Sequence, residues 1–115
     1  MSNAETVREY YDLVDAEEYD DLVALFAPDV TYERPGQSPI EGREELRRFY
    51  EEERPLSKGS HEVHTVVSDG DTVAVRGSFS GRQGDRQVAF GFADFHELEN
   101  GQIVRRYTFT DRDEV

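Results

Sequence analysis

The sequence predicts an α+β domain in which helices cover one face of a curved antiparallel sheet. Apolar residues recur at helical spacing only in the first half of the chain, up to about residue 55. From residue 60 onward, apolar and polar residues alternate at every second position, in segments that turn sequences separate. Helices followed by a meander of strands are typical of the α+β class, because each strand pairs with the next one along the chain.

Three helices are expected before the sheet. The first has Asn3 as its N-cap and an apolar stripe over residues 6–19. The second covers residues 19–26 and ends before Pro28, because proline cannot continue a helix. The third follows a glycine and ends before Pro55 for the same reason.

The strands are expected from the two-residue alternation and from two turn signals. The sequence Asp69-Gly70-Asp71 predicts one turn, and Asn100-Gly101 is a strong hairpin signal. A short strand also separates the second helix from the third. The expected strands are residues 30–34, 63–67, 73–80, 88–98 and 103–111.

Length and composition restrict the function classes. The 115 residues predict a single domain over residues 1–115, and the absence of cysteine excludes disulfides and thiolate zinc sites. No apolar run reaches the roughly 18 residues of a membrane span, and no signal peptide opens the chain, so a cytoplasmic protein is expected. The glycine-containing loop at residues 77–84 has no phosphate-binding pattern, and no cofactor is expected.

The chain is strongly acidic, with 26 acidic residues against 13 basic ones and a net charge of −13. This charge argues against nucleic acid and anionic membranes as partners, because both would repel the protein. Only Lys58 is a lysine. An acidic surface of this kind favours a halophilic origin, since carboxylates repel one another less at high ionic strength. An acidic protein of an ordinary cytosol is the alternative.

The strand at residues 88–98 places a carboxylate on its apolar face. The residues on that face are Val88, Phe90, Phe92, Asp94, His96 and Leu98. Because a buried carboxylate is costly unless it is paired or protonated, Asp94 is a candidate functional residue. The alternative is that Asp94 lies at the rim of the sheet or bonds a helix terminus.

Two long segments carry a family resemblance. The first, "EYYDLVDAEEYDDLVALFAPDVTYERPGQSPIEGREELRRFYEE", contains "LVD", "APD", "PIEGRE" and "FY" in that order. The second is "GFADFHELENGQIVRRYTFTD". Together they resemble the SnoaL-like and ketosteroid isomerase-like branch of the nuclear transport factor 2-like superfamily, over nearly the whole chain. The resemblance implies a cone-shaped fold, with three N-terminal helices packed on a curved, mostly antiparallel sheet and a small-molecule pocket between them. It implies no single activity, because this fold carries several enzymes and plain binders.

The resemblance also implies roles for individual residues. Tyr10 falls on the tyrosine of the isomerases' oxyanion hole, Tyr50 on the tyrosine that supports it, and Asp94 on the second donor, a protonated aspartic acid. Arg34, just before Pro35, falls where the isomerases keep their general-base aspartate. A guanidinium cannot abstract a proton, and beside Asp94 it would also keep that carboxyl ionised. We therefore expect no ketosteroid isomerase activity.

Two interpretations of the pocket remain open. In the first, the protein is an enzyme of isomerase, cyclase or hydrolase type that acts on a small apolar oxygenated compound. Asp94 is then the general base, Arg34 holds it, and Tyr10 is the acid or orienting group. His96 either relays a proton or is an imidazole at the edge of the sheet. An epoxide hydrolase would need a second aspartate, for which Asp111 is a weak candidate.

In the second interpretation the protein is a binding module. Arg34 would clamp a carboxylate ligand, or would form an internal ion pair with Asp94. In both interpretations the same residues are expected to contact the ligand: Tyr32, Tyr50, Val75, Phe79, Phe90, Phe92 and His96.

Two further features concern metal binding and association. His61 and His64 are three apart on a strand and point to opposite faces, so no metal site is expected. Small and aromatic residues share the outer face of the sheet and predict a two-fold homodimer through it, as the family often forms. The alternative is that the chain's own ends cover the aromatic residues. This outer face comprises Ala74, Ser78, Gly91, Ala93, Phe95, Tyr107 and Phe109.

Overall fold

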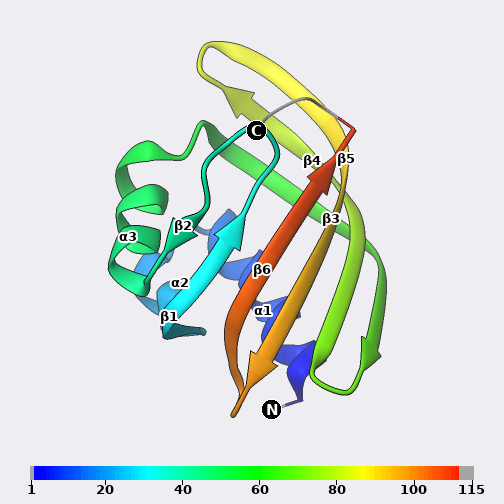
Figure 1. Ribbon diagram of the computed structural model, residues 1–115. Coiled ribbons are helices and arrows are strands. Elements are labelled where there is room, and N and C mark those ends of the chain that lie inside the picture. The colour runs from blue at the N-terminus through cyan, green and yellow to red at the C-terminus, as the bar shows by residue number, and fades with distance from the viewer. Residues whose placement is uncertain (1, 112–115) are drawn as a thin grey trace.

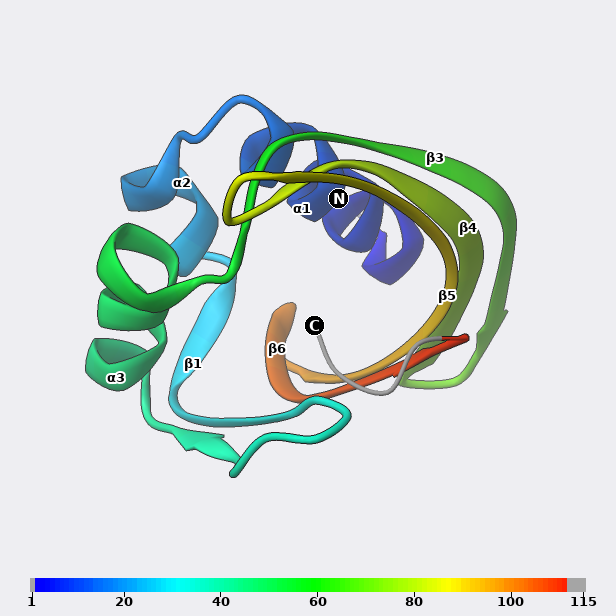
Figure 2. The same cartoon turned by 90° about the horizontal axis from the view of Figure 1, so that it is seen from above.

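The computed structural model describes residues 2–111 and consists of helices packed against one side of a six-stranded sheet (Figure 1). The strand order is β2-β1-β6-β5-β4-β3. Neighbouring strands run antiparallel except for β1 and β6, which are parallel. In Figure 2 the sheet bends round from β3 to β1, with α1 against its concave side. The expected α+β class with a curved, mostly antiparallel sheet is confirmed.

The helices are α1 (Asn3–Asp15), α2 (Tyr19–Val23) and α3 (Arg43–Arg48), and a π-helical turn (Phe49–Glu53) continues α3. The strands are β1 (Phe26–Glu33), β2 (Ile40–Glu41), β3 (Leu56–Asp69), β4 (Thr72–Gln83), β5 (Arg86–Glu99) and β6 (Gln102–Thr110). Within residues 2–111, no helix is both long enough and apolar enough to cross a membrane.

Helix α1 begins one residue earlier than expected, with Ser2 rather than Asn3 as its N-cap. The Ser2 hydroxyl accepts a hydrogen bond from the Glu5 backbone, and the Glu5 carboxylate accepts one from the Ser2 backbone. This reciprocal pair satisfies two of the N–H groups that every helix start leaves without partners. The helix buries its apolar stripe, which includes Tyr10 and Tyr11, against the sheet.

The second helix is shorter than expected, because β1 already begins at Phe26. Pro28, which was expected to end the helix, lies inside β1. The pairing of β1 with β6 is irregular between Phe26 and Thr31, so the missing N–H of Pro28 disrupts no regular ladder there.

The third helical segment ends where expected but changes its geometry on the way. After α3, the chain widens into the π-helical turn, in which the Arg54 N–H donates to the Phe49 carbonyl at 2.7 Å. Such turns are rare in proteins, and many of those that occur lie at functional sites. This one buries Phe49 and Tyr50, and β3 then begins at Leu56, earlier than the sequence pattern predicted.

Candidate functional site

A pocket opens between the sheet and the helical side of the molecule. Its empty volume, with the open mouth included, is about 440 Å³. Aromatic rings supply most of the wall: Tyr10, Tyr32, Phe49, Tyr50, Phe79, Phe90 and Phe92. The polar and charged lining consists of Arg34, Arg54, His61, Asp94, Arg106 and Thr108.

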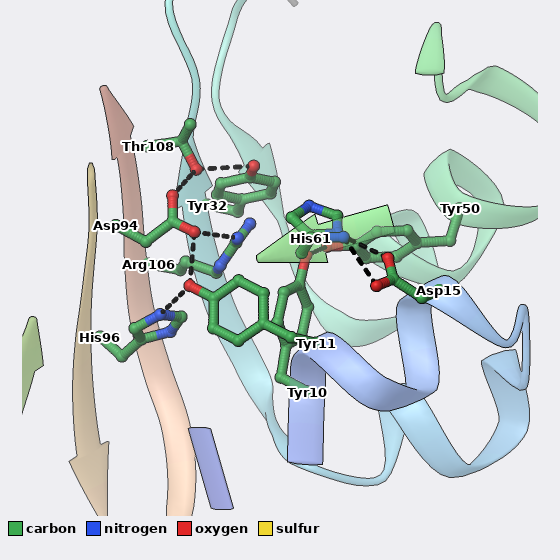
Figure 3. A network of polar contacts seen from close by, with 10 residues as sticks. All are labelled: Tyr10, Tyr11, Asp15, Tyr32, Tyr50, His61, Asp94, His96, Arg106 and Thr108. Carbon is green, nitrogen blue, oxygen red and sulfur yellow. Dashed lines mark hydrogen bonds and ion pairs between the residues drawn. The ribbon is translucent and has the colours of Figure 1, made fainter. Parts of the chain in front are cut away.

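The polar centre of the site is built by the register between β5 and β6. Asp94 lies opposite Thr108, and the next inward residue of β6 towards its start is Arg106. Asp94 Oδ2 accepts hydrogen bonds from Arg106 Nη2 at 2.8 Å and from the Tyr11 hydroxyl at 2.6 Å. Asp94 Oδ1 accepts one from the Thr108 hydroxyl at 2.7 Å (Figure 3). Both carboxylate oxygens are therefore already engaged.

These contacts determine the charge of Asp94, whose side chain is only 2% exposed. Burial alone would raise the pKa of its carboxyl. The neighbouring Arg106 charge, with help from the hydrogen bonds of Tyr11 and Thr108, outweighs burial and lowers the pKa below its usual value. Asp94 is ionised at neutral pH and has no proton to donate to an oxyanion.

Arg106 is the other half of this ion pair. Its guanidinium carbon lies 4.3 Å from the centre of the Tyr10 ring and 4.5 Å from that of Tyr32, an arrangement that favours a cation. Burial would lower its pKa, but Asp94 raises it well above the ordinary value. Among the described residues, Arg106 Nε and Nη1 have no hydrogen-bond partner although both atoms are buried. Buried N–H groups are nearly always paired, so these two donors call for an oxygen acceptor.

Arg34 lines the pocket but is not the partner of Asp94. It follows the last residue of β1, is half-buried, and lies 4.1 Å over the Phe49 ring. Glu33, the preceding residue, is exposed. The expected contact between Arg34 and Asp94 is thus not realised, because Arg106 on the neighbouring strand already occupies that place.

Tyr10 and Tyr50 share a hydrogen bond, with 2.6 Å between their hydroxyl oxygens. Burial raises the pKa of Tyr50 to about 12 and the pKa of Tyr10 well above its ordinary value, so both stay protonated. The tyrosine that bonds Asp94, however, is Tyr11. Tyr10 instead packs its ring on Arg106.

The expected ligand contacts divide into two groups. Tyr32, Tyr50, Phe79, Phe90 and Phe92 line the pocket and remain candidate ligand contacts. Val75 and His96 do not: Val75 is part of the core between sheet and helices, and His96 lies deeper, below Tyr11.

His96 is fully buried rather than at the edge of the sheet. Its Nε2 lies 3.2 Å from the Tyr11 hydroxyl. Burial lowers its pKa to about 3, with the Arg106 charge acting in the same direction. His96 is therefore neutral at physiological pH. Asp111 is also displaced from the site, because its carboxylate accepts from the Gly91 backbone on the outer side of the sheet.

The profile of the SnoaL-like domain family matches residues 7–106 of the chain. The chain belongs to the SnoaL-like domain family. The expected resemblance to the SnoaL-like and ketosteroid isomerase-like branch of the nuclear transport factor 2-like superfamily is confirmed by this match and by similar solved structures, which include a candidate ketosteroid isomerase of Kribbella flavida. That protein is 28% identical with a TM-score of 0.79, over 96% of this chain and 78% of that one. An LEH-like epoxide hydrolase of M. tuberculosis is 20% identical with a TM-score of 0.85, over 95% and 82% of the two chains. This second likeness shows the fold alone.

One curated relative is similar over a shorter stretch. The orange carotenoid-binding protein of Limnospira maxima is 44% identical over 48 residues, which are 42% of this chain. The stretch covers only 15% of the length of that relative.

Sequence reasoning missed Tyr11, Arg106 and Thr108. A signal for the last two was available, because the alternation that turns Tyr107 outward turns Arg106 and Thr108 inward. Tyr11 is adjacent to Tyr10 on α1, and both residues belong to the same buried stripe. Helical spacing cannot decide which of them reaches the strand carboxylate.

Proposed function

We propose that this SnoaL-like domain binds a small, largely apolar molecule that carries a carboxylate or a similar anionic oxygen group. The observation that carries the proposal is Arg106. Its guanidinium is buried in the pocket, and its Nε and Nη1 atoms lack partners among the described residues. A carboxylate oxygen is a suitable acceptor for either atom, because hydrogen bonds from a guanidinium to an anionic oxygen are charge-assisted and strong.

The charges of the pocket support an anionic ligand. Among the described residues that line it, Arg34, Arg54 and Arg106 are cationic and Asp94 is the carboxylate. The pocket is therefore locally positive in a chain whose net charge is −13. Arginines in a concave site attract anions to it, and the aromatic walls suit the apolar part of the ligand.

The same geometry makes Asp94 a poor general base. Both of its oxygens accept hydrogen bonds, and its lowered pKa disfavours proton uptake. We assign to Asp94 the role of holding Arg106 in place. The interpretation of the domain as an enzyme that uses Asp94 as its base, and the ketosteroid isomerase reaction in particular, is correspondingly disfavoured.

An apolar carotenoid is a second candidate ligand. The similarity to a carotenoid-binding protein and the aromatic lining favour it. The small volume of the pocket and the arginines that line it favour the anionic ligand instead. Titration with a carotenoid in detergent, compared with titration with the carboxylate 3-phenylpropanoate, separates the two candidates.

Calorimetric titration with 3-phenylpropanoate and with its neutral amide tests the proposal. We expect the carboxylate to bind at least about tenfold more tightly than the amide, because charged hydrogen bonds contribute about 1.5–3 kcal/mol. Arg106→Lys keeps a positive charge beside Asp94 but loses the Nε and Nη1 donors, and should weaken carboxylate binding by about 10- to 100-fold. Arg76→Lys, on the exposed side of β4, is the matched control and should bind normally. Equal affinity for acid and amide would refute the proposal.

A further inference from the structure

A second polar pair joins His61, which is on β3 and lines the pocket, to Asp15 at the end of α1. His61 Nδ1 lies 2.6 Å from Asp15 Oδ1, and the His61 backbone N–H donates to Asp15 Oδ2 at 2.8 Å. A carboxylate can only accept, so Nδ1 carries the proton of this hydrogen bond. In the neutral imidazole, Nε2 is then left with a lone pair and can act as a base.

The imidazole is held by its neighbours and lines the ligand space. His61 lines the same pocket as Arg106, and its side chain is 9% exposed. Its ring packs against the rings of Phe79, Phe92 and Tyr11, with centroids 4.9, 5.6 and 5.4 Å away. Within residues 2–111, no side chain bonds Nε2. In the view of Figure 3 the imidazole lies between Asp15 and the cluster around Asp94 and Arg106.

Two unfavourable local features accompany the placement of this pair, one at the end of α1 and one in β3. Asp15 is the last residue of α1, where the helix dipole disfavours a carboxylate, and no basic residue in the last turn offsets it. On the other side, β3 is irregular just before His61: Lys58 has a positive φ of 49°, and the pairing register shifts between Ser57 and Ser60. Bulges of this kind redirect side chains beside active sites.

We propose that His61 is a catalytic general base, that Asp15 positions it, and that the substrate is an anionic carbon acid with a C–H next to a carbonyl group. The proposal rests on the proposed function, because the pocket arginines must hold the anion. His61 Nε2 takes the proton from carbon, and the electron pair of that C–H bond forms a C=C bond as the carbonyl electrons move onto oxygen. The imidazolium then returns a proton to carbon or to the enolate oxygen. The outcome is isotope exchange or tautomerisation, and no oxidant or reductant is needed.

Phenylpyruvate in D₂O is the probe, because it combines an aromatic ring, a carboxylate and acidic protons beside a ketone. Proton NMR follows the loss of its C3 protons, and calorimetry on the same protein follows its binding. We expect the protein to accelerate exchange over buffer. His61→Gln should lower the rate at least about 100-fold and change the affinity little. His64→Gln is the matched control and should keep the full rate, since His64 lies on the same strand and is not among the residues that line the pocket.

Asp15→Asn tests the positioning role separately. We expect a lower kcat with KM nearly unchanged, together with a shift of His61 away from the Nδ1–H tautomer in ¹⁵N NMR. Binding of phenylpyruvate without accelerated exchange would overturn the inference and leave the proposed function intact. So would a His61→Gln variant with the full rate, or a wild-type His61 in the Nε2–H tautomer. Failure to bind phenylpyruvate and 3-phenylpropanoate would overturn the proposed function, and this inference with it.

Discussion

At the scale of single residues, His96 makes the stability of the fold depend on pH. Its pKa is lowered from 6.5 to about 3 in the folded state, because the ring is buried and Arg106 is near. The unfolded chain therefore binds a proton that the folded chain does not, from about pH 6.5 down to about pH 3. In that interval the free energy of unfolding should fall on acidification by up to about 1.4 kcal/mol per pH unit from this residue alone.

Urea unfolding at pH 7, 6, 5 and 4 measures this dependence. His96→Gln, which cannot titrate, should flatten the dependence relative to wild type, whatever its effect at pH 7. His64→Gln removes a more exposed histidine and is the control for the exchange of a histidine for glutamine. If the free energy of unfolding falls with pH equally in wild type and in His96→Gln, the buried neutral histidine does not account for the loss of stability in acid.

At the scale of secondary-structure elements, Gly59 shows how closely the edge strand β3 packs against Phe79, a residue that lines the pocket. A Cβ on Gly59 would overlap the ring of Phe79. Gly59→Ala should therefore push β3 away from β4 and lower the free energy of unfolding by about 1–3 kcal/mol, the usual cost of overpacking. Gly91→Ala is a suitable control, because a Cβ there meets only ordinary contacts at 3.5 Å and beyond. Equal stability of the two variants in urea would contradict this view of β3.

The elements also show why some of the fold was predictable and some was not. Strands β4, β5 and β6 were expected nearly in place, because alternation and turn residues are both local signals. Phe26 was assigned to a helix, because its spacing from Leu22 and Val23 fits a helical stripe equally well. The ion pair of Asp94 depends on the β5–β6 register, which links residues 12 positions apart, and the His61–Asp15 pair spans 46. Contacts of this range leave no periodic pattern in the chain.

At the scale of the whole molecule, the acidic charge and the outer face of the sheet have opposite effects on the association of two copies of the chain. A net charge of −13 drives copies of the chain apart at low salt. The outer face nevertheless exposes Phe109 by 57%, Val67 by 58% and Phe95 by 41%. The Phe95 and Phe109 rings contact each other edge to face, and small residues such as Ala74 and Ala93 flank shallow hollows beside them. A second copy of the same face offers both the rings and the hollows that would cover them.

We therefore expect a two-fold homodimer through the outer face, with a dimer fraction that increases with KCl concentration. Salt screens the repulsion between the acidic copies and leaves the apolar contact in place. Sedimentation at micromolar protein in about 0.1 M and about 2 M KCl measures the effect, because the Debye length falls from about 10 Å to below about 3 Å between the two. Phe109→Asp should give a monomer with nearly unchanged stability, because the ring is exposed in the single chain. Gln37→Asp adds the same charge in an exposed loop and should still dimerise. A wild-type monomer in high salt would exclude this interface and would leave the exposed aromatic residues to another partner.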